Sequence, residues 1–423
     1  MQDCLVAAGG NIHCSKRLES AATWCHRRVS ATRYGLYYRL INVNNVAVKR
    51  LMVVCLATVA ADVSLAQLGK TLWEFWDVRK AETNYGVRSD LYHHDLAKNT
   101  TAIGAWGLRR YPIKTNSLGF IDRTVRQVPL QSKRYRVLLL GDSFTEGIGV
   151  AFENSFAGIL HDGLRKHGVE VLNAAVASYS PAIYYRKAKY LIEDVGLHVD
   201  EVIVFIDISD IDDEATVYDI DEHDRVIGLH DRPEISEEAN AHWTQGLDDA
   251  LKNNSVLVRF SDTLSHRLFD PDPDYGACRA AGEKALAAMT NLERSLWTVN
   301  DTVFEKYATR GLQKAEQNME RLLRVLERSG ITLTIAVYPW PDQILYKDVD
   351  SKQVRFWKGW AAKNSVGFLN LFPYFVNGDN PKEIIGNYFI PCDMHLNEAG
   401  HRLFAKAFFQ ECRARLSHSR ACS

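Results

Sequence analysis

The sequence predicts an α/β protein with a doubly wound, three-layer fold, in which a parallel sheet lies between two layers of helices. From Arg136 onward, short runs rich in leucine and β-branched residues alternate with amphipathic helical windows, as in consecutive βαβ units. These runs show little apolar–polar alternation, which is typical of strands buried on both faces. With 423 residues, 46% of them hydrophobic, the chain is long enough for one large domain and an appendage.

Five runs are predicted to be strands and five windows are predicted to be helices. The strands are residues 137–141, 169–173, 201–206, 331–338 and 366–371. The helices are residues 155–166, 182–195, 312–329, 353–363 and 397–416. Residues 218–300 are too many for a crossover connection and begin with an acidic, hairpin-like stretch, so we expect an inserted cap that narrows the site.

The N-terminal third differs from the rest. Residues 1–50 are basic, with only Asp3 and Glu19 as acids, and are predicted to be a disordered cytosolic tail. Residues 51–69 are predicted to be a membrane signal anchor, which would place the following domain outside the inner (plasma) membrane. A cleaved signal peptide, giving a periplasmic or secreted protein, and a buried helix of a soluble protein remain alternatives. Residues 70–130 are expected to be a lead-in segment that packs on a main domain at 131–420.

Composition excludes several classes of function. The 51 basic and 52 acidic side chains leave a net charge of -1, without the basic excess that nucleic-acid binding requires. The eight cysteines form no CxxC pair, so no metal site is predicted. If the domain is exported, Cys392 is expected to pair with Cys278 or with Cys412, and the spacing does not decide between them.

Two segments carry residues suited to catalysis. Ser143 directly follows the first predicted strand, at the sheet edge where open α/β proteins place their sites. A helix N-cap role explains such a serine equally well. His395 precedes the last predicted helix, and Asp393 stands two residues before it. A carboxylate can orient an imidazole whose other nitrogen takes a proton from a serine, so the three residues form a chemically complete set.

The segments GDSF (141–144) and DMHLNEAGH (393–401) resemble the first and last motif blocks of the SGNH, or GDSL-type, hydrolase superfamily. The resemblance extends over about residues 136–416. It implies a flavodoxin-like sheet, no cofactor, and Ser143 as nucleophile, His395 as base and Asp393 as the orienting acid.

The sequence departs from the family pattern at three positions. Cys392 stands where the acid usually lies, three residues before the histidine. Ser178 aligns with the glycine of the second block, and Ser209 with the asparagine of the third. The resemblance therefore implies an oxyanion hole made by the N–H groups of Ser143 and Ser178 and the hydroxyl of Ser209.

Two further features have ordinary explanations. The acidic run 207–214 lacks the ordered spacing of a calcium loop, so we expect a solvated helix start. The aromatic segment 338–341 is expected to be a rigid turn, with stacking on a sugar or acyl group as the alternative.

The expected function is a serine-dependent ester hydrolase or O-acyltransferase that acts on acylated carbohydrate or cell-envelope glycan, without a cofactor. Its expected partners are that ester substrate and, through residues 51–69, a membrane. The alternative is a catalytically silent glycan-binding or assembly protein that retains the fold. A nucleotide-binding protein is disfavoured because neither GxGxxG nor GxxxxGK[ST] follows the first strand.

Overall fold

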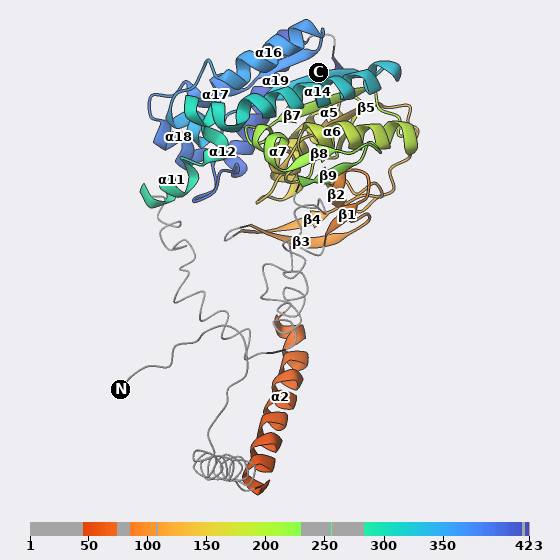
Figure 1. The fold of residues 1–423 in the computed structure, drawn as a ribbon. Helices are drawn as coiled ribbons and strands as arrows, with labels where there is room; N and C mark the ends of the chain where they lie inside the picture. The colour runs from red at the N-terminus through yellow and green to blue at the C-terminus, as the bar shows by residue number, and fades with distance from the viewer. Residues whose placement is uncertain are drawn as a thin grey trace, which may run out of the picture. The chain divides into compact units, whose positions relative to one another are not determined.

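Five parallel strands form the central sheet of the computed structural model (Figure 1). In chain order they are β5 (Tyr135–Leu140), β6 (Val169–Asn173), β7 (Glu201–Ile206), β10 (Thr332–Val337) and β11 (Gly367–Asn370). They are arranged β11-β10-β7-β5-β6 across the sheet, which is the order of a flavodoxin-like, doubly wound fold. The predicted fold class is confirmed, and each predicted strand lies within two residues of an observed one.

The structure describes residues 45–73, 85–106, 109–229, 255, 283–416 and 419–422. The chain divides into two units, one of residues 1–71 with 247–262 and one of residues 72–246 with 263–423. The sheet, its helices and all site residues discussed below belong to the second unit.

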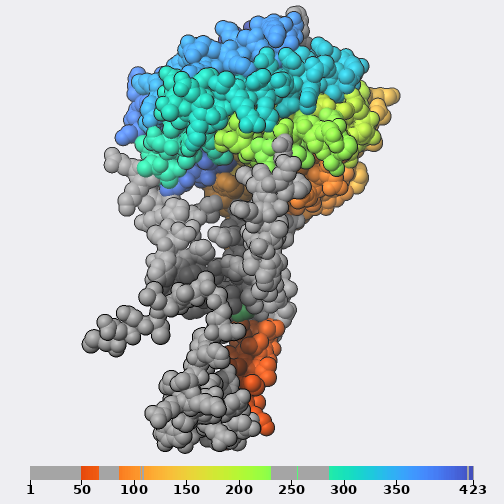
Figure 2. Space-filling view, viewed as in Figure 1, coloured from red at the N-terminus to blue at the C-terminus, as the bar shows by residue number. Residues whose placement is uncertain are grey.

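Helices cover both faces of the sheet. On one face α5 (Phe156–Arg165) packs against α19 (Glu398–Arg415). On the other face α6 (Pro181–Lys189) packs against α14 (Thr309–Arg328), and Lys363 of α16 (Lys352–Lys363) lies 3.6 Å from Glu316 of α14. Figure 2 shows the surface of this second face, where the residues of α14 adjoin those of α6.

The remaining helices are short. They are α4 (Ser143–Glu146), α7 (Asp210–Thr216), α11 (Glu283–Met289), α12 (Glu293–Leu296), α13 (Asp301–Val303), α15 (Pro341–Leu345), α17 (Phe372–Val376) and α18 (Pro381–Tyr388). Single turns of 3-10 or π type are η1 (Phe152–Asn154), η2 (Tyr190–Asp194), η5 (Phe304–Ala308) and η6 (Arg420–Cys422).

The core forms where the sheet meets its helices. Every residue of β7 is buried, as expected for a central strand covered on both faces. Phe156 of α5 stacks on Phe404 of α19 with ring centroids 4.1 Å apart, and both rings contact Phe205 of β7. Side-chain caps start the two helices, from Ser155 for α5 and Asn397 for α19.

The lead-in segment forms two antiparallel hairpins, which its sequence pattern did not indicate. β1 (Gly86–Ser89) pairs with β2 (His93–Leu96), and β3 (Thr101–Trp106) pairs with β4 (Arg109–Lys114). The first hairpin contacts the sheet domain through Asp95, whose carboxylate lies 2.7 Å from the buried ammonium of Lys187 on α6.

Residues 45–73 form the helix α2 (Asn45–Trp73), which includes the predicted anchor. No helix in the described part of the chain is both long and apolar enough to cross a membrane. The signal-anchor prediction is therefore not supported. Of the predicted disordered tail at 1–50, residues 1–44 lie outside the described residues, whereas residues 45–50 belong to α2, which corrects the prediction there.

The predicted insertion begins with a hairpin, as expected, formed by β8 (Tyr218–Ile220) and β9 (Val226–Gly228). It ends with α11 and α12. Its central residues 230–254 and 256–282 lie outside the described residues, so the cap stays a prediction.

Cys412 is disulfide-bonded to Cys422, which corrects the option that Cys412 pairs with Cys392. Cys392 is itself disulfide-bonded. Disulfides are typical of proteins from oxidising compartments, which agrees with the extracytoplasmic location that stays a prediction here.

Candidate active site

Ser143 is the first residue of α4, directly after the buried strand β5. Asp142 caps this short helix by accepting a hydrogen bond from the Phe144 N–H. Gly141 permits the tight turn, because a Cβ at this position would lie 2.2 Å from the Thr145 hydroxyl oxygen. The serine side chain is half-buried, so its hydroxyl stands at the carboxyl end of the sheet with access to solvent.

His395 meets Ser143 across 252 positions of sequence. Its Nε2 lies 2.7 Å from Ser143 Oγ, and its Nδ1 lies 2.5 Å from Asp393 Oδ1. Burial opposes the charge on Asp393, but the charge and hydrogen bonds of His395 hold the pKa of that carboxyl below its usual value. The three predicted residues thus form one chain of hydrogen bonds, although their catalytic role stays a prediction.

Trp106, at the end of β3, also contacts this chain of hydrogen bonds, which its sequence context did not indicate. Its indole Nε1–H donates to Asp393 Oδ2 at 2.7 Å. Its ring lies edge-on to the His395 imidazole, with centroids 5.1 Å apart. Trp106 therefore holds Asp393 from the side opposite to His395, and no local motif in the lead-in segment indicates this.

The position before the acid is occupied by Cys392, which is disulfide-bonded and has a φ of 63°. The carboxylate that reaches His395 comes instead from Asp393, which also accepts the His395 backbone N–H at 2.8 Å. A two-residue spacing therefore suffices, because the Asp393 carboxylate turns back onto both the backbone and the ring of His395.

Ser178 lies in the loop between β6 and α6 and has a φ of 61°, a left-handed conformation that glycine adopts most easily. This observation fits its alignment with the glycine of the second block. Within the described part of the chain, no acceptor occupies the Ser178 backbone N–H. That N–H therefore remains available to an oxyanion.

Ser209 does not support its predicted role. Its hydroxyl lies 2.6 Å from Asp207 Oδ1, and its backbone N–H donates to the same oxygen at 2.7 Å. The hydroxyl proton is already used, because a carboxylate two residues away is the nearest strong acceptor. An oxyanion would have to compete with Asp207 for the hydroxyl proton of Ser209.

Three of the five carboxyls in the acidic run are buried, which corrects the expectation of a solvated helix start. Asp207, Asp210 and Glu214 are fully buried, and oxygens of Asp142, Asp207 and Asp210 lie within 4.8 Å of one another. Among the described residues, this is the one acidic cluster compact enough to hold a cation. Burial, together with the charge of Asp207, raises the pKa of Asp142 and of Asp210, so protons offset part of the charge.

Aromatic donors complete the cluster. Tyr338 donates its hydroxyl to Asp142 at 3.1 Å, and Trp340 donates its indole N–H to Asp207 at 2.6 Å. Both rings are buried, so they pack beneath the site and offer no face to a ligand. Of the two readings of segment 338–341, the rigid turn describes these residues.

A cavity of about 610 Å³ opens beside the histidine loop. Met394, between Asp393 and His395, lines it together with residues of α7, α12 and η5, namely Asp212, Glu293, Arg294, Lys306 and Tyr307. Its wall combines both signs of charge with one aromatic ring.

No protein-family model and no curated protein matches the sequence. Solved structures do. An acetylxylan esterase from Geobacillus stearothermophilus matches at 13% identity and a TM-score of 0.34, covering 67% of this chain and 96% of that one. A lipolytic G-D-S-L family protein from Veillonella parvula matches at 12% identity and a TM-score of 0.32, covering 65% of this chain and 97% of that one. A psychrotrophic esterase from Pseudoalteromonas matches at 11% identity and a TM-score of 0.33, covering 66% of this chain and 97% of that one.

These names agree with the resemblance inferred from residues 141–144 and 393–401. At such identities and TM-scores the likeness carries no argument about activity. Inferences about activity rest instead on the geometry of the described residues.

Proposed function

We propose that this chain is a serine-dependent ester hydrolase or O-acyltransferase that acts on acylated carbohydrate. The observation that carries the proposal is the continuous chain of hydrogen bonds from Ser143 through His395 to Asp393. Such a chain activates a hydroxyl that is otherwise too weak a nucleophile at neutral pH.

In the proposed reaction, Ser143 Oγ attacks the ester carbonyl carbon while His395 Nε2 takes the hydroxyl proton. Asp393 stabilises the resulting imidazolium, and the N–H groups of Ser143 and Ser178 hold the oxyanion. His395 then gives its proton to the departing alcohol, which leaves an acyl group on Ser143. Water or a sugar hydroxyl attacks this acyl-enzyme, giving its proton to His395, which returns it to Ser143.

The cavity beside Met394 supports the carbohydrate part of the proposal. Sugars offer hydroxyl groups that both donate and accept hydrogen bonds, together with apolar ring faces. Carboxylates at Asp212 and Glu293 and cations at Arg294 and Lys306 match the hydrogen-bonding groups of a sugar.

The proposal is tested by replacing Ser143 with alanine in the full chain. We expect turnover of a short-chain p-nitrophenyl ester to fall about a thousandfold or more, because the nucleophile is removed. A fluorophosphonate probe should label the wild type on Ser143 and leave the variant unlabelled. Ser329→Ala, at an exposed serine after α14, is the matched control and should keep both properties.

Equal turnover by the wild type and Ser143→Ala would contradict the mechanism. A wild-type protein that neither labels nor turns over esters, but binds acetylated oligosaccharides, would favour the silent glycan-binding alternative. Adding a sugar acceptor and separating the products distinguishes transfer from hydrolysis.

A further inference from the structure

The peptide unit that joins Ala177 to Ser178 is held from outside the loop. Its carbonyl, on Ala177, lies 2.8 Å from Nε2 of His94, a residue of the lead-in hairpin. Its N–H, on Ser178, is the donor proposed for the oxyanion. Because a peptide unit is planar and rigid, a bond that fixes the direction of the carbonyl also fixes the direction of the N–H on its other side.

We propose that His94 is a positioning residue, which holds the Ala177 carbonyl so that the Ser178 N–H points into the oxyanion hole. The inference rests on the proposed function and adds a residue to its machinery. His94 itself does not contact the reacting atoms in this proposal.

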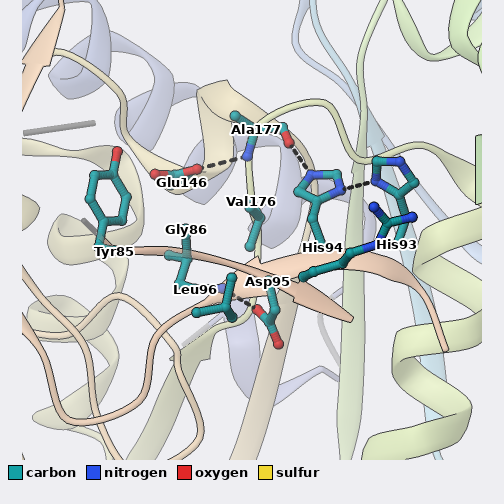
Figure 3. Close-up of a pocket in the computed structure, with 11 residues that line it drawn as sticks. Tyr85, Gly86, His93, His94, Asp95, Leu96, Glu146, Val176 and Ala177 are labelled. Carbon is teal, nitrogen blue, oxygen red and sulfur yellow. Dashed lines mark hydrogen bonds between the residues drawn. The ribbon is translucent and has the colours of Figure 1, made fainter. Parts of the chain in front are cut away.

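A second contact fixes the neighbouring peptide. Glu146, the last residue of α4, accepts the Ala177 N–H at 2.7 Å. Figure 3 shows both bonds, with Ala177 between the Glu146 carboxylate on one side and the His94 ring on the other. Because α4 begins with Ser143, this contact ties the loop to the helix that carries the nucleophile.

The direction of the hydrogen bonds around His94 follows from the Ala177 carbonyl, which can only accept. Nε2 of His94 therefore carries the proton, and Nδ1 of the neutral ring accepts. His93 Nδ1 lies 2.8 Å from that Nδ1 and is the matching donor. Burial lowers the pKa of His94 to about 4, so the ring is neutral at physiological pH.

The hairpin is anchored firmly enough to act as a support. Tyr179 donates its hydroxyl to the His94 backbone carbonyl at 2.8 Å, and the two rings meet edge to face with centroids 5.0 Å apart. The next residue, Asp95, pairs with the buried Lys187 at 2.7 Å. Tyr179 belongs to the same loop as Ser178, so its contacts tie the hairpin to that loop, whereas the Asp95–Lys187 pair ties the hairpin to α6.

The hydrogen bond to the carbonyl has an electronic effect as well. Donation to a peptide carbonyl polarises the whole unit and strengthens its N–H as a donor, because hydrogen bonds in series reinforce one another. Both effects act on transition-state stabilisation rather than on substrate binding. Loss of His94 should therefore lower kcat and leave KM nearly unchanged.

The test compares His94→Phe and His94→Gln with the wild type, using a short-chain p-nitrophenyl ester. Phe keeps an aromatic ring and removes both nitrogens, whereas the Gln amide can donate to the Ala177 carbonyl from nearly the position of Nε2. Fluorophosphonate titration counts the active sites, so kcat refers to folded protein. His167→Gln, at an exposed histidine after α5, is the control.

We expect His94→Phe to lower kcat about tenfold with KM within about twofold of the wild type, a smaller loss than removal of an oxyanion donor causes. His94→Gln should recover most of the lost rate. Wild-type kcat in His94→Phe would overturn the inference. Equal losses in both variants, in step with lowered melting temperatures, would assign His94 a packing role and overturn it too. An inactive wild type would instead refute the proposed function, and the inference with it.

Discussion

At the scale of single residues, the unexpected partner in the site is Trp106. It holds Asp393 Oδ2 at 2.7 Å while Asp393 Oδ1 holds His395. The indole N–H therefore prevents the carboxylate from rotating away from the imidazole. Its contribution should be largest in the transition state, when His395 is positively charged and depends most on Asp393.

Trp106→Phe should lower kcat by about tenfold to a hundredfold, because a hydrogen bond to a charged group contributes about 1.5–3 kcal/mol. The measurement is kcat and KM for a p-nitrophenyl ester, with KM expected to change little. Trp360→Phe is the matched control, because the buried Trp360 Nε1 has no partner within the described residues. An unchanged kcat in Trp106→Phe would show that Asp393 needs no second support.

Residues next to a recognisable motif were predictable, and residues remote from one were not. Ser143, Asp393 and His395 lie in local patterns, and the structure brings them together. Trp106 and His94 reach the site by folding of a hairpin segment without a motif. The Ser209 prediction followed alignment alone, and alignment does not reveal that Asp207 competes for its hydroxyl.

At the scale of elements, the loop between β6 and α6 carries backbone strain at a functional position. Ser178 has a φ of 61°, where a Cβ crowds the following carbonyl. Its proposed contribution is a backbone N–H, which any residue except proline supplies. Strain and function can therefore be separated by substitution at this one position.

Ser178→Gly should raise the free energy of unfolding by about 0.5 kcal/mol, since relief of the left-handed strain exceeds the entropy cost of glycine. Ser178→Ala should leave stability near the wild-type value, and both variants should keep kcat because both keep the N–H. Denaturant unfolding and ester turnover measure the two quantities. If both variants lose more than about fivefold in kcat, the hydroxyl rather than the backbone is the donor.

Elements buried on both faces were predicted well, and others were not. The runs 169–173 and 201–206 coincide with β6 and β7, because continuous apolar stretches between helical windows have few alternatives. β1 and β2 escaped prediction, since each is only four residues long, both include polar residues, and a tertiary contact, Asp95 with Lys187, holds their hairpin. β3 and β4 escaped it because the apolar run of β3 includes a glycine and β4 includes a proline. The run 207–214 was misread because charged residues are usually solvated.

At the scale of the whole molecule, the sheet domain contains several buried ionisable groups whose pKa values move in opposite directions. Burial raises the pKa of Glu146 to about 7, and that of Asp213 also to about 7. Burial lowers the pKa of His94 to about 4 and that of His401 to about 3. The pH dependence of stability is the sum of these opposing contributions.

The signs follow from which state binds protons more tightly. A carboxyl with a raised pKa keeps its proton in the folded state. The contribution of Glu146 to stability therefore falls as the pH rises from 4.5, its pKa in the unfolded chain, through 7, its pKa in the folded protein. A histidine with a lowered pKa stays neutral when folded, so stability is lost as pH falls below 6.5 toward 4. Between pH 6 and 8 the two classes act against each other, and the wild-type profile alone does not separate them.

Glu146→Gln separates them, because the amide keeps an acceptor for the Ala177 N–H but does not titrate. The histidine contributions are the same in both proteins and cancel in the difference. For a pKa of about 7 folded and 4.5 unfolded, linkage predicts that the variant gains about 1 kcal/mol of stability relative to the wild type between pH 6 and pH 8. Denaturant unfolding at the two pH values measures it, with Glu153→Gln on η1 as an exposed control. Parallel profiles for Glu146→Gln and the wild type would mean that Glu146 is already ionised in the folded protein at pH 6, and that the Ala177 N–H and Lys187 outweigh its burial.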